Sequence, residues 1–247
     1  MGPGAPSSRL VQVVVDARDP WALAGWWRRA LDWRPGYSDD HEADVDPPEG
    51  EPGVGLVFVP VDPPSAGRQR LHLDLDTSSV AEQRLVVAEL LDLGARRLDV
   101  GQGEVPWEVL ADPEGNAFCV LDPRPEYDGS GRVAALVAEA RDPHSLAAFW
   151  RAASGWEPVR TSDDVVALRR GDTGPHLELV RSPHPHAGKN RWHLDLRPVR
   201  AAGRDAALRE LLARGARHAD VGQGQVAWDV LADPEGNEFC LLAGPVD

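Results

Sequence analysis

The sequence predicts an α+β protein made of two related halves. A stretch of 23 residues, 99–121, returns at 220–242 with 18 identical residues. An earlier segment also returns, because Arg18-Asp19-Pro20 matches Arg141-Asp142-Pro143 at an offset of 123. Such repetition marks duplicated structural units and decides the architecture before single residues are considered. A length of 247 residues allows two domains, each with a core of its own.

Each half begins with a strand and a helix. Residues 10–16 are rich in valine and alternate, so that Gln12, Val14 and Asp16 share one face of a strand. A helix is predicted over 20–31, because Asp19 suits the N-cap and proline suits the first helical position. A loop rich in Pro, Asp and Glu is expected to follow as far as Gly53, with a strand near 55–61. The matching strands of the second half are predicted at 165–169 and 176–180.

A second strand and helix follow in each half. Residues 71–75 and 192–196 alternate strictly, so that one face carries His72 with Asp74, or His193 with Asp195. The first of the two helices has Ser79 and Glu82 at capping-box spacing, and the other is predicted over about 199–214.

The repeated stretch completes each half with two strands. In the first copy a strand ends at Ala111, a turn spans 112–115 and a last strand spans 116–121. Each half therefore reads as βαβββ followed by βαβββ. The predicted domains are 9–123 and 132–244, joined by a linker at 124–131. With helices on one face of each sheet, the other face is expected either to be covered by a partner sheet or to form a cleft.

Composition and charge narrow the function. Asp and Glu outnumber Lys and Arg by 40 to 26, and the resulting net charge of −14 disfavours a nucleic-acid partner. Apolar runs are far shorter than the ~20 residues of a membrane helix, and the first residues lack an apolar signal core. We therefore expect a cytoplasmic protein with no membrane partner, as a monomer or homodimer. Cys119 and Cys240 hold equivalent positions and are expected to be buried thiols.

These motifs together resemble a known family. The module order, the Asp-Pro start of the first helix, the segment 190–196 (NRWHLDL) and the closing VGQG…W…VLADPEGNEFC are similar to the glyoxalase-like branch of the vicinal oxygen chelate superfamily. Relatives in this superfamily include glyoxalase I, extradiol dioxygenases and bleomycin-resistance proteins. The resemblance covers about residues 9–123 and 132–244. It implies tandem domains, each formed by two βαβββ modules that make a cupped, partly open barrel.

The resemblance also implies where a metal would bind. Metal-dependent members take one ligand from the first strand and one from the last strand of each module. The corresponding residues are Gln12, Val57 or Phe58, His72 and Cys119 in the first half, and Ala135, Glu178, His193 and Cys240 in the second. Each half thus keeps two expected ligands of four, whereas catalytic metal sites normally use three or more.

Glu178 and His193 are predicted to lie on neighbouring strands, and His176 shares the face of Glu178. These three residues could form a set of two histidines and one carboxylate for Zn, Ni, Mn or Fe, with Glu178 as ligand or catalytic base. His72 and Gln12 are the metal-ligand candidates of the first half. The alternative is a structural role, in which each histidine hydrogen-bonds its Asp neighbour or a backbone carbonyl.

Substrate contacts are predicted at the mouth of each cup. Trp107 and Trp228 could stack on a flat ligand, although recurrence in both halves also suits core packing. Gln102 and Gln223 lie in Gly-Gln-Gly loops that precede a strand, which predicts a rim loop and not a phosphate loop. Arg191 ends a basic, histidine-containing loop, which is either a solvated loop or a lid that recognises a carboxylate.

Three functions remain open. The first is a small-molecule binder, similar to the drug-sequestering relatives. The second is a lyase, isomerase or dioxygenase in which a divalent metal polarises neighbouring substrate oxygens. The third is a pseudo-enzyme whose cups serve only assembly.

Overall fold

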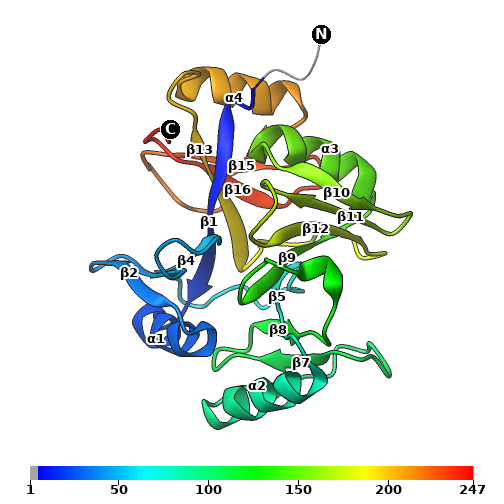
Figure 1. The fold of residues 1–247 in the computed structure, drawn as a ribbon. Coiled ribbons are helices and arrows are strands. Elements are labelled where there is room, and N and C mark those ends of the chain that lie inside the picture. Colours follow the sequence, from blue (N-terminus) through cyan, green and yellow to red (C-terminus); the bar gives the residue numbers. More distant parts are fainter. Residues whose placement is uncertain (1–4, 247) are drawn as a thin grey trace.

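The computed structural model describes residues 5–246, which form four βαβββ modules in chain order (Figure 1). Module 1 contains β1 (Ser8–Ala17), α1 (Pro20–Leu31), β2 (Arg34–Ser38), β3 (Ala43–Asp46) and β4 (Gly55–Pro60). Module 2 contains β5 (Leu71–Leu75), α2 (Val80–Asp92), β6 (Arg96–Arg97), β7 (Glu108–Ala111) and β8 (Ala117–Val120). The 3₁₀ turn η1 (Pro125–Tyr127) lies in the predicted linker. Module 3 contains β9 (Val133–Ala140), α3 (Pro143–Ser154), β10 (Glu157–Thr161), β11 (Val165–Arg169) and β12 (His176–Arg181). Module 4 contains β13 (Trp192–Pro198), α4 (Arg204–Ala213), β14 (Arg217–His218), β15 (Asp229–Ala232) and β16 (Glu238–Leu241). The predicted α+β class and module order are confirmed.

The four modules pair across the halves of the chain. Within residues 5–246, modules 1 and 4 form one eight-stranded sheet, sheet A, and modules 2 and 3 form another, sheet B. Sheet A is joined where β1 pairs antiparallel with β13, and sheet B where β5 pairs antiparallel with β9. The expectation that each half closes its own cup is therefore wrong. The linker connects two modules of one sheet, whereas the segments 61–70 and 182–191 lead from one sheet to the other.

A shared core lies between the two sheets. In β1, Val13 and Val15 are fully buried, whereas Gln12, Val14 and Asp16 face the opposite side, as the alternation predicted. Trp27 of α1 packs edge-on against Phe118 of sheet B and Trp192 of sheet A. Trp150 of α3 makes the corresponding contact with Phe239. Both helices thus lie against the convex faces and leave the concave faces open.

The structure follows the predicted helix starts in three of four cases. Asp19 accepts a hydrogen bond from the Ala22 amide at 3.0 Å, which caps α1 at the predicted residue. Ser79 caps α2, but the Glu82 carboxylate accepts from the Ser78 amide, so the reciprocal bond of a capping box is shifted by one residue. The last helix begins at Arg204 and not near Val199, because a turn precedes it and Gly203 takes the N-cap.

A second difference concerns the acidic segment after α1. It was predicted as a loop, but it contains the strands β2 and β3. Ala43 and Val45 are buried in the core while Asp44 and Asp46 point to the other side, so the segment has the alternation of a strand. Its high content of Asp, Glu and Pro concealed this pattern.

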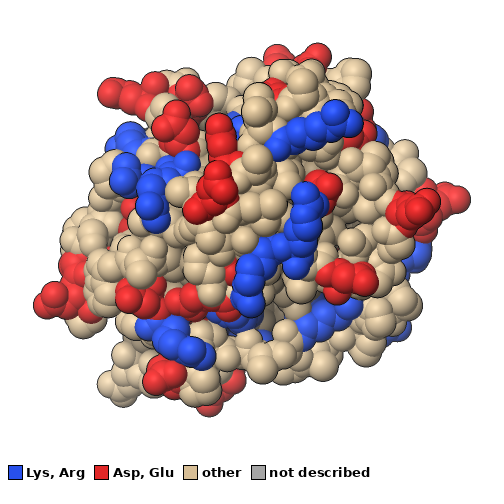
Figure 2. All heavy atoms as spheres, turned by 90° about the horizontal axis from the view of Figure 1, so that it is seen from below, with Lys and Arg blue, Asp and Glu red and all other residues tan. Residues whose placement is uncertain are grey.

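The surface carries charges of both signs. Figure 2 shows the molecule from below, where groups of Lys and Arg and groups of Asp and Glu are interspersed over the face. None of the helices in the described chain combines the length and the apolar character that crossing a membrane would need.

Candidate functional site: two cups on the concave faces

Each sheet has a large cavity on its concave face. The cavity of sheet A, cup A, has a volume of about 890 Å³ and is walled by β1, β2, β3, β4, β13, β15 and β16. The cavity of sheet B, cup B, has a volume of about 930 Å³ and is walled by β5, β7, β8, β9, β10, β11 and β12. Both volumes lie within the range of about 300–1,000 Å³ that is usual for small-molecule sites.

The cross-half pairing changes which predicted residues meet. Gln12 and His193 lie in cup A, whereas His72 and Glu178 lie in cup B. The proposed set of His176, Glu178 and His193 is therefore wrong, because His193 belongs to the other sheet. In cup A, Val14 of β1 is paired with His193 of β13 on one side and with Val57 of β4 on the other. Val137 holds the same position in cup B, opposite Glu178 and His72.

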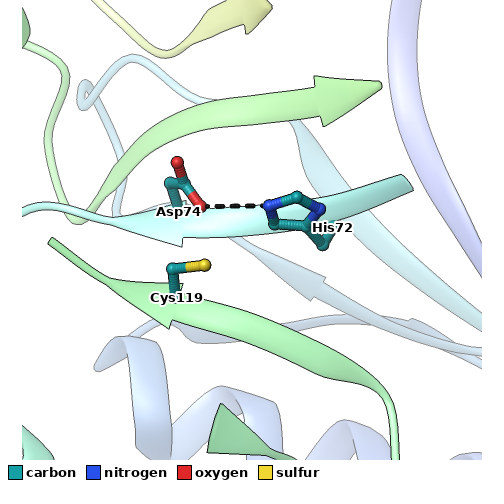
Figure 3. Close-up of side chains that lie close together, drawn as sticks. All are labelled: His72, Asp74 and Cys119. Atoms are coloured by element: carbon teal, nitrogen blue, oxygen red, sulfur yellow. Dashed lines mark ion pairs between the residues drawn. The ribbon is translucent and has the colours of Figure 1, made fainter. Parts of the chain in front are cut away.

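Both cups contain the same histidine, aspartate and cysteine group. His193, Asp195 and Cys240 form the group of cup A, and the duplicate in cup B is His72, Asp74 and Cys119. Within each group one potential ligand atom per residue lies within 4.8 Å of the others. Figure 3 shows the cup B group, with His72 and Asp74 on β5 and Cys119 on the neighbouring strand β8. Strand alternation connected the histidines with their aspartates, and the family resemblance placed Cys119 and Cys240 at ligand positions in the same halves as His72 and His193.

The carboxylate of the cup A group has a neutral hydrogen-bond partner. The Gln12 amide donates to Asp195 Oδ2 at 2.9 Å, and His193 Nε2 lies 3.4 Å from Asp195 Oδ1. Burial raises the pKa of the Asp195 carboxyl to about 7, although the Gln12 bond acts in the opposite direction. Burial also lowers the pKa of His193 to about 3, so the imidazole is neutral at pH 7. Among residues 5–246, Asp195 Oδ1 has no hydrogen-bond donor.

The cysteines are protonated in this arrangement. Burial, with the adjacent Asp195 carboxylate, raises the pKa of the Cys240 thiol well above its usual value. Cys119 has the same shift from burial and Asp74. Both were predicted as buried thiols, and both are buried without a disulfide in the described chain. A bound cation would have to displace the thiol proton before sulfur could act as a ligand.

Glu178 in cup B has two side-chain partners. Its Oε1 accepts a hydrogen bond from the Tyr127 hydroxyl at 3.0 Å and pairs with Arg160 at 2.5 Å. Burial raises the pKa of Glu178, and the Arg160 charge opposes that rise. Tyr127 belongs to η1, so the linker contributes a buried side chain to this cup. Neither Tyr127 nor Arg160 was predicted, because a tyrosine in a Pro/Gly-rich linker and a strand arginine carry no distinctive motif.

His176 is a packing residue in the described structure. Its ring is 3% exposed and lies 5.4 Å from the Tyr127 ring, centroid to centroid. Burial lowers its pKa to about 4. It lies behind Glu178 and does not line the cavity of cup B.

The rim loops hold the other predicted contacts. Trp228 and Gln223 line cup A, whereas Trp107, Gln102 and Arg191 line cup B. The Gln102 and Gln223 side chains accept hydrogen bonds from backbone amides two residues earlier, at 2.9 and 2.8 Å, which closes each Gly-Gln-Gly loop tightly. Arg124 lies over the Trp107 ring at 5.3 Å, and Trp228 is 41% exposed.

One wall of cup A was missed by sequence analysis. Tyr37, Glu42 and Asp44 come from the segment predicted as a loop, and all three line the cavity. Burial and the charges of Glu42 and Asp46 raise the pKa of Asp44 to about 7. The alternation Ala-Asp-Val-Asp over 43–46 is the signal that could have located this wall.

Comparison with known proteins agrees with this architecture. The model of the glyoxalase-like domain matches residues 12–121 and again residues 135–242. The crystal structure of glyoxalase I from Zea mays is similar with a TM-score of 0.69 at 14% identity, covering 96% of this chain and 92% of that one. A putative dioxygenase from Bacillus subtilis is similar with a TM-score of 0.61 at 13% identity, covering 98% of this chain and 87% of that one. A search by sequence among curated proteins found no match. At these identities the structural likeness establishes the fold alone, and the two family-model matches establish that the chain belongs to the glyoxalase-like domain family, with two copies in tandem.

Proposed function

We propose that the protein binds a small organic molecule in each of its two cups. The observation that carries this proposal is the pair of separate cavities, about 890 and 930 Å³, on the concave faces of the two sheets. Valine and other apolar side chains line much of each cavity together with polar and charged side chains, and one tryptophan lies at each rim. Cavities of this kind bury most of a small ligand and fix its orientation through the few polar groups.

The rim tryptophans supply the largest single contact surfaces. Trp228 is partly exposed at the mouth of cup A, and Trp107 is held beneath Arg124 at the mouth of cup B. An aromatic ligand that stacks on either ring would bury a large apolar area at little conformational cost. The protonated thiols and neutral His193 at the floor suit hydrogen bonding to a neutral group better than covalent chemistry.

Titration with dansylamide, a neutral aromatic fluorophore, tests this function. We expect two binding sites per chain in the wild type. Trp228→Ala is expected to weaken one site, and Trp107→Ala the other, each by at least about tenfold. Trp21→Ala serves as the control, since this tryptophan is 46% exposed and lines neither cup. Failure of dansylamide to bind, or two unchanged sites in both rim variants, would contradict the proposal.

A second candidate function is metal-dependent catalysis, favoured by the repeated histidine, aspartate and cysteine group. Nitrogen, sulfur and carboxylate oxygen are the ligands that zinc prefers, and catalytic zinc sites commonly use three protein ligands. The residues fit such an ion, because Asp195 Oδ1 and Asp74 Oδ1 are buried and lack a hydrogen-bond donor in the described chain. When bound, the ion would polarise a substrate oxygen as a Lewis acid. Lyase, isomerase and dioxygenase activities are the reactions to assay.

Zinc titration followed by elemental analysis tests the metal site. We expect about two zinc ions per chain after dialysis in the wild type. The variants Asp195→Asn and Asp74→Asn are each expected to weaken one site by about 10- to 100-fold, and the double variant both. His186→Ala is the control, because its imidazole lies outside both groups and pairs with Glu238. Zinc retention that the double variant leaves intact would show adventitious binding, and no retention of Zn, Ni, Mn or Fe would overturn the metal site.

A further inference from the structure

The two cups differ most along one wall. In cup A this wall is formed by β2 and β3, and in cup B by the duplicate strands β10 and β11. At the offset of 123 residues that relates these strands, Arg160 of cup B replaces Tyr37 of cup A. Val165 replaces Glu42, and Ala167 replaces Asp44. The two walls therefore have the same strand arrangement, but these three positions carry acidic side chains in cup A and a basic one in cup B.

The carboxylate on this side of the cavity comes from a different strand in each cup. In cup A, Asp44 of β3 lies opposite Val57 of β4. In cup B, Ala167 of β11 lies opposite Glu178 of β12. Residues directly opposite each other on antiparallel strands have Cβ atoms about 4.5–5.5 Å apart, so both carboxylates enter their cups at nearly the same place.

These two carboxylates are partnered differently. Glu178 is neutralised within the protein by Arg160, 2.5 Å away, and by the Tyr127 hydroxyl. Asp44 forms no ion pair within residues 5–246, and its buried Oδ1 has no hydrogen-bond donor there. Glu42, two residues before Asp44, also forms no ion pair in the described chain. Cup A thus presents two carboxylates that form no ion pair in the described chain, although the charge of Arg197 acts on Glu42, and cup B presents none of this kind on the matching wall.

The remaining charges strengthen the contrast. The charged side chains lining cup A are Asp16, Glu42, Asp44, Asp195 and Glu238, against Lys189 and Arg197. Those lining cup B are Asp74, Glu139 and Glu178, against Arg68, Arg124, Arg160 and Arg191. In cup A, Lys189 is already paired with Asp16. The lining of cup A therefore carries more acidic than basic side chains, whereas in cup B the four arginines outnumber the three acidic residues and each pairs with a carboxylate.

Two aromatic rings complete the wall of cup A. Tyr37 of β2, next to the acidic strand β3, is 59% exposed, and Trp228, which precedes β15 at the other end of the sheet, is 41% exposed; both line the cavity. Aromatic faces attract cations through the ring quadrupole, and carboxylates attract them directly. Half-buried carboxylates without an ion pair, together with exposed aromatic faces, make a site for an organic cation.

We propose that cup A selects an organic cation, an ammonium or amidinium group on an apolar body, which cup B rejects. Asp44 and Glu42 take the positive group, and Tyr37 and Trp228 take the body. In cup B, Glu178 is already paired with Arg160 and Glu139 with Arg68, so these carboxylates are not free to take the same ligand. This inference rests on the proposed function, because it specifies the ligand charge of one of the two proposed binding cavities.

Three probes with one fluorophore test the inference: dansylcadaverine carries an ammonium group, dansylamide is neutral and dansylglycine carries a carboxylate. The Trp107→Ala variant isolates cup A. There we expect dansylcadaverine to bind at least about tenfold more tightly than dansylamide at low salt, with dansylglycine weakest. Adding Asp44→Asn and Glu42→Gln is expected to abolish the preference and leave dansylamide binding unchanged. Asp44→Asn alone is expected to remove part of it, which keeps the test valid if the combined variant is unstable.

The control is Asp163→Asn with Asp205→Asn, which changes the net charge by the same amount at two exposed residues outside both cups. It is expected to keep the preference. A cation that binds cup A no better than dansylamide would overturn the inference and leave the proposed function intact. A preference that survives the loss of Asp44 and Glu42 charge would also overturn it. Absence of dansylamide binding in both cups would instead overturn the proposed function itself.

Discussion

Replacement of Trp27 by alanine is expected to lower the free energy of unfolding by about 3–5 kcal/mol. Trp27 is fully buried, and its Nε1 donates to Asp112 Oδ2 at 3.0 Å. Its ring packs edge-on against three aromatic rings, those of Trp26, Phe118 and Trp192, with centroids 5.1 to 5.9 Å away. The substitution leaves a large cavity where α1 meets both sheets and removes one hydrogen bond to a buried carboxylate. Urea unfolding followed by circular dichroism measures the loss.

The control for this experiment is Trp21→Ala on the same helix. Trp21 is 46% exposed, and its Nε1 donates to the Asp39 carbonyl at 3.2 Å. We expect a loss below about 1 kcal/mol, because no core cavity forms. Equal losses for the two variants would mean that helix propensity, and not the aromatic core between the sheets, determines the effect.

The order of the modules could be predicted from the sequence, but their pairing could not. The strand segments 72–75 and 193–196 both read His-Leu-Asp-Leu, with the same apolar and polar faces. Either segment therefore satisfies the alternation that β1 requires of its partner, and the local pattern does not choose between them. The choice is made by tertiary contacts such as the packing of Trp27 on Trp192, which no local pattern reports.

The candidate site was predictable where motifs repeat. His72 and His193 were located by strand alternation, and Trp107 and Trp228 by the duplicated closing stretch. Asp44 was not predicted as a site residue, because an acidic, proline-containing segment has the composition of a loop even where its apolar residues alternate. Tyr127 was not predicted either, because a linker residue reaches Glu178 only once the chain has folded. The proposed ligand preference of cup A depends on residues that differ between the duplicates, and a search for repeats passes over such residues.

Replacement of Arg70 by methionine is the second change with a large expected effect. Arg70 is 2% exposed and connects three modules. Its guanidinium donates to Asn237 Oδ1 at 2.9 Å, to the His184 carbonyl at 2.7 Å and to the Glu139 carbonyl at 2.8 Å. Methionine keeps much of the apolar stem but leaves these acceptors without a donor, beside the carboxylate of Glu235, which lies 3.6 Å from the guanidinium. Removal of one partner from a buried charged network is expected to cost about 3–5 kcal/mol.

Arg191 provides the matched control, since it holds the position of Arg70 in the second half at an offset of 121. Its side chain is 15% exposed, and its hydrogen bonds to Glu114 and to the Asp16 carbonyl are long, at 3.3 to 3.4 Å. We expect Arg191→Met to cost less than about 1.5 kcal/mol in the same unfolding measurement. A large difference between the two variants would establish that the segments leading from one sheet to the other are fixed asymmetrically, by a buried arginine on one side and a solvent-accessible one on the other. Equal costs would contradict this, because burial of the guanidinium is the main difference between the two positions.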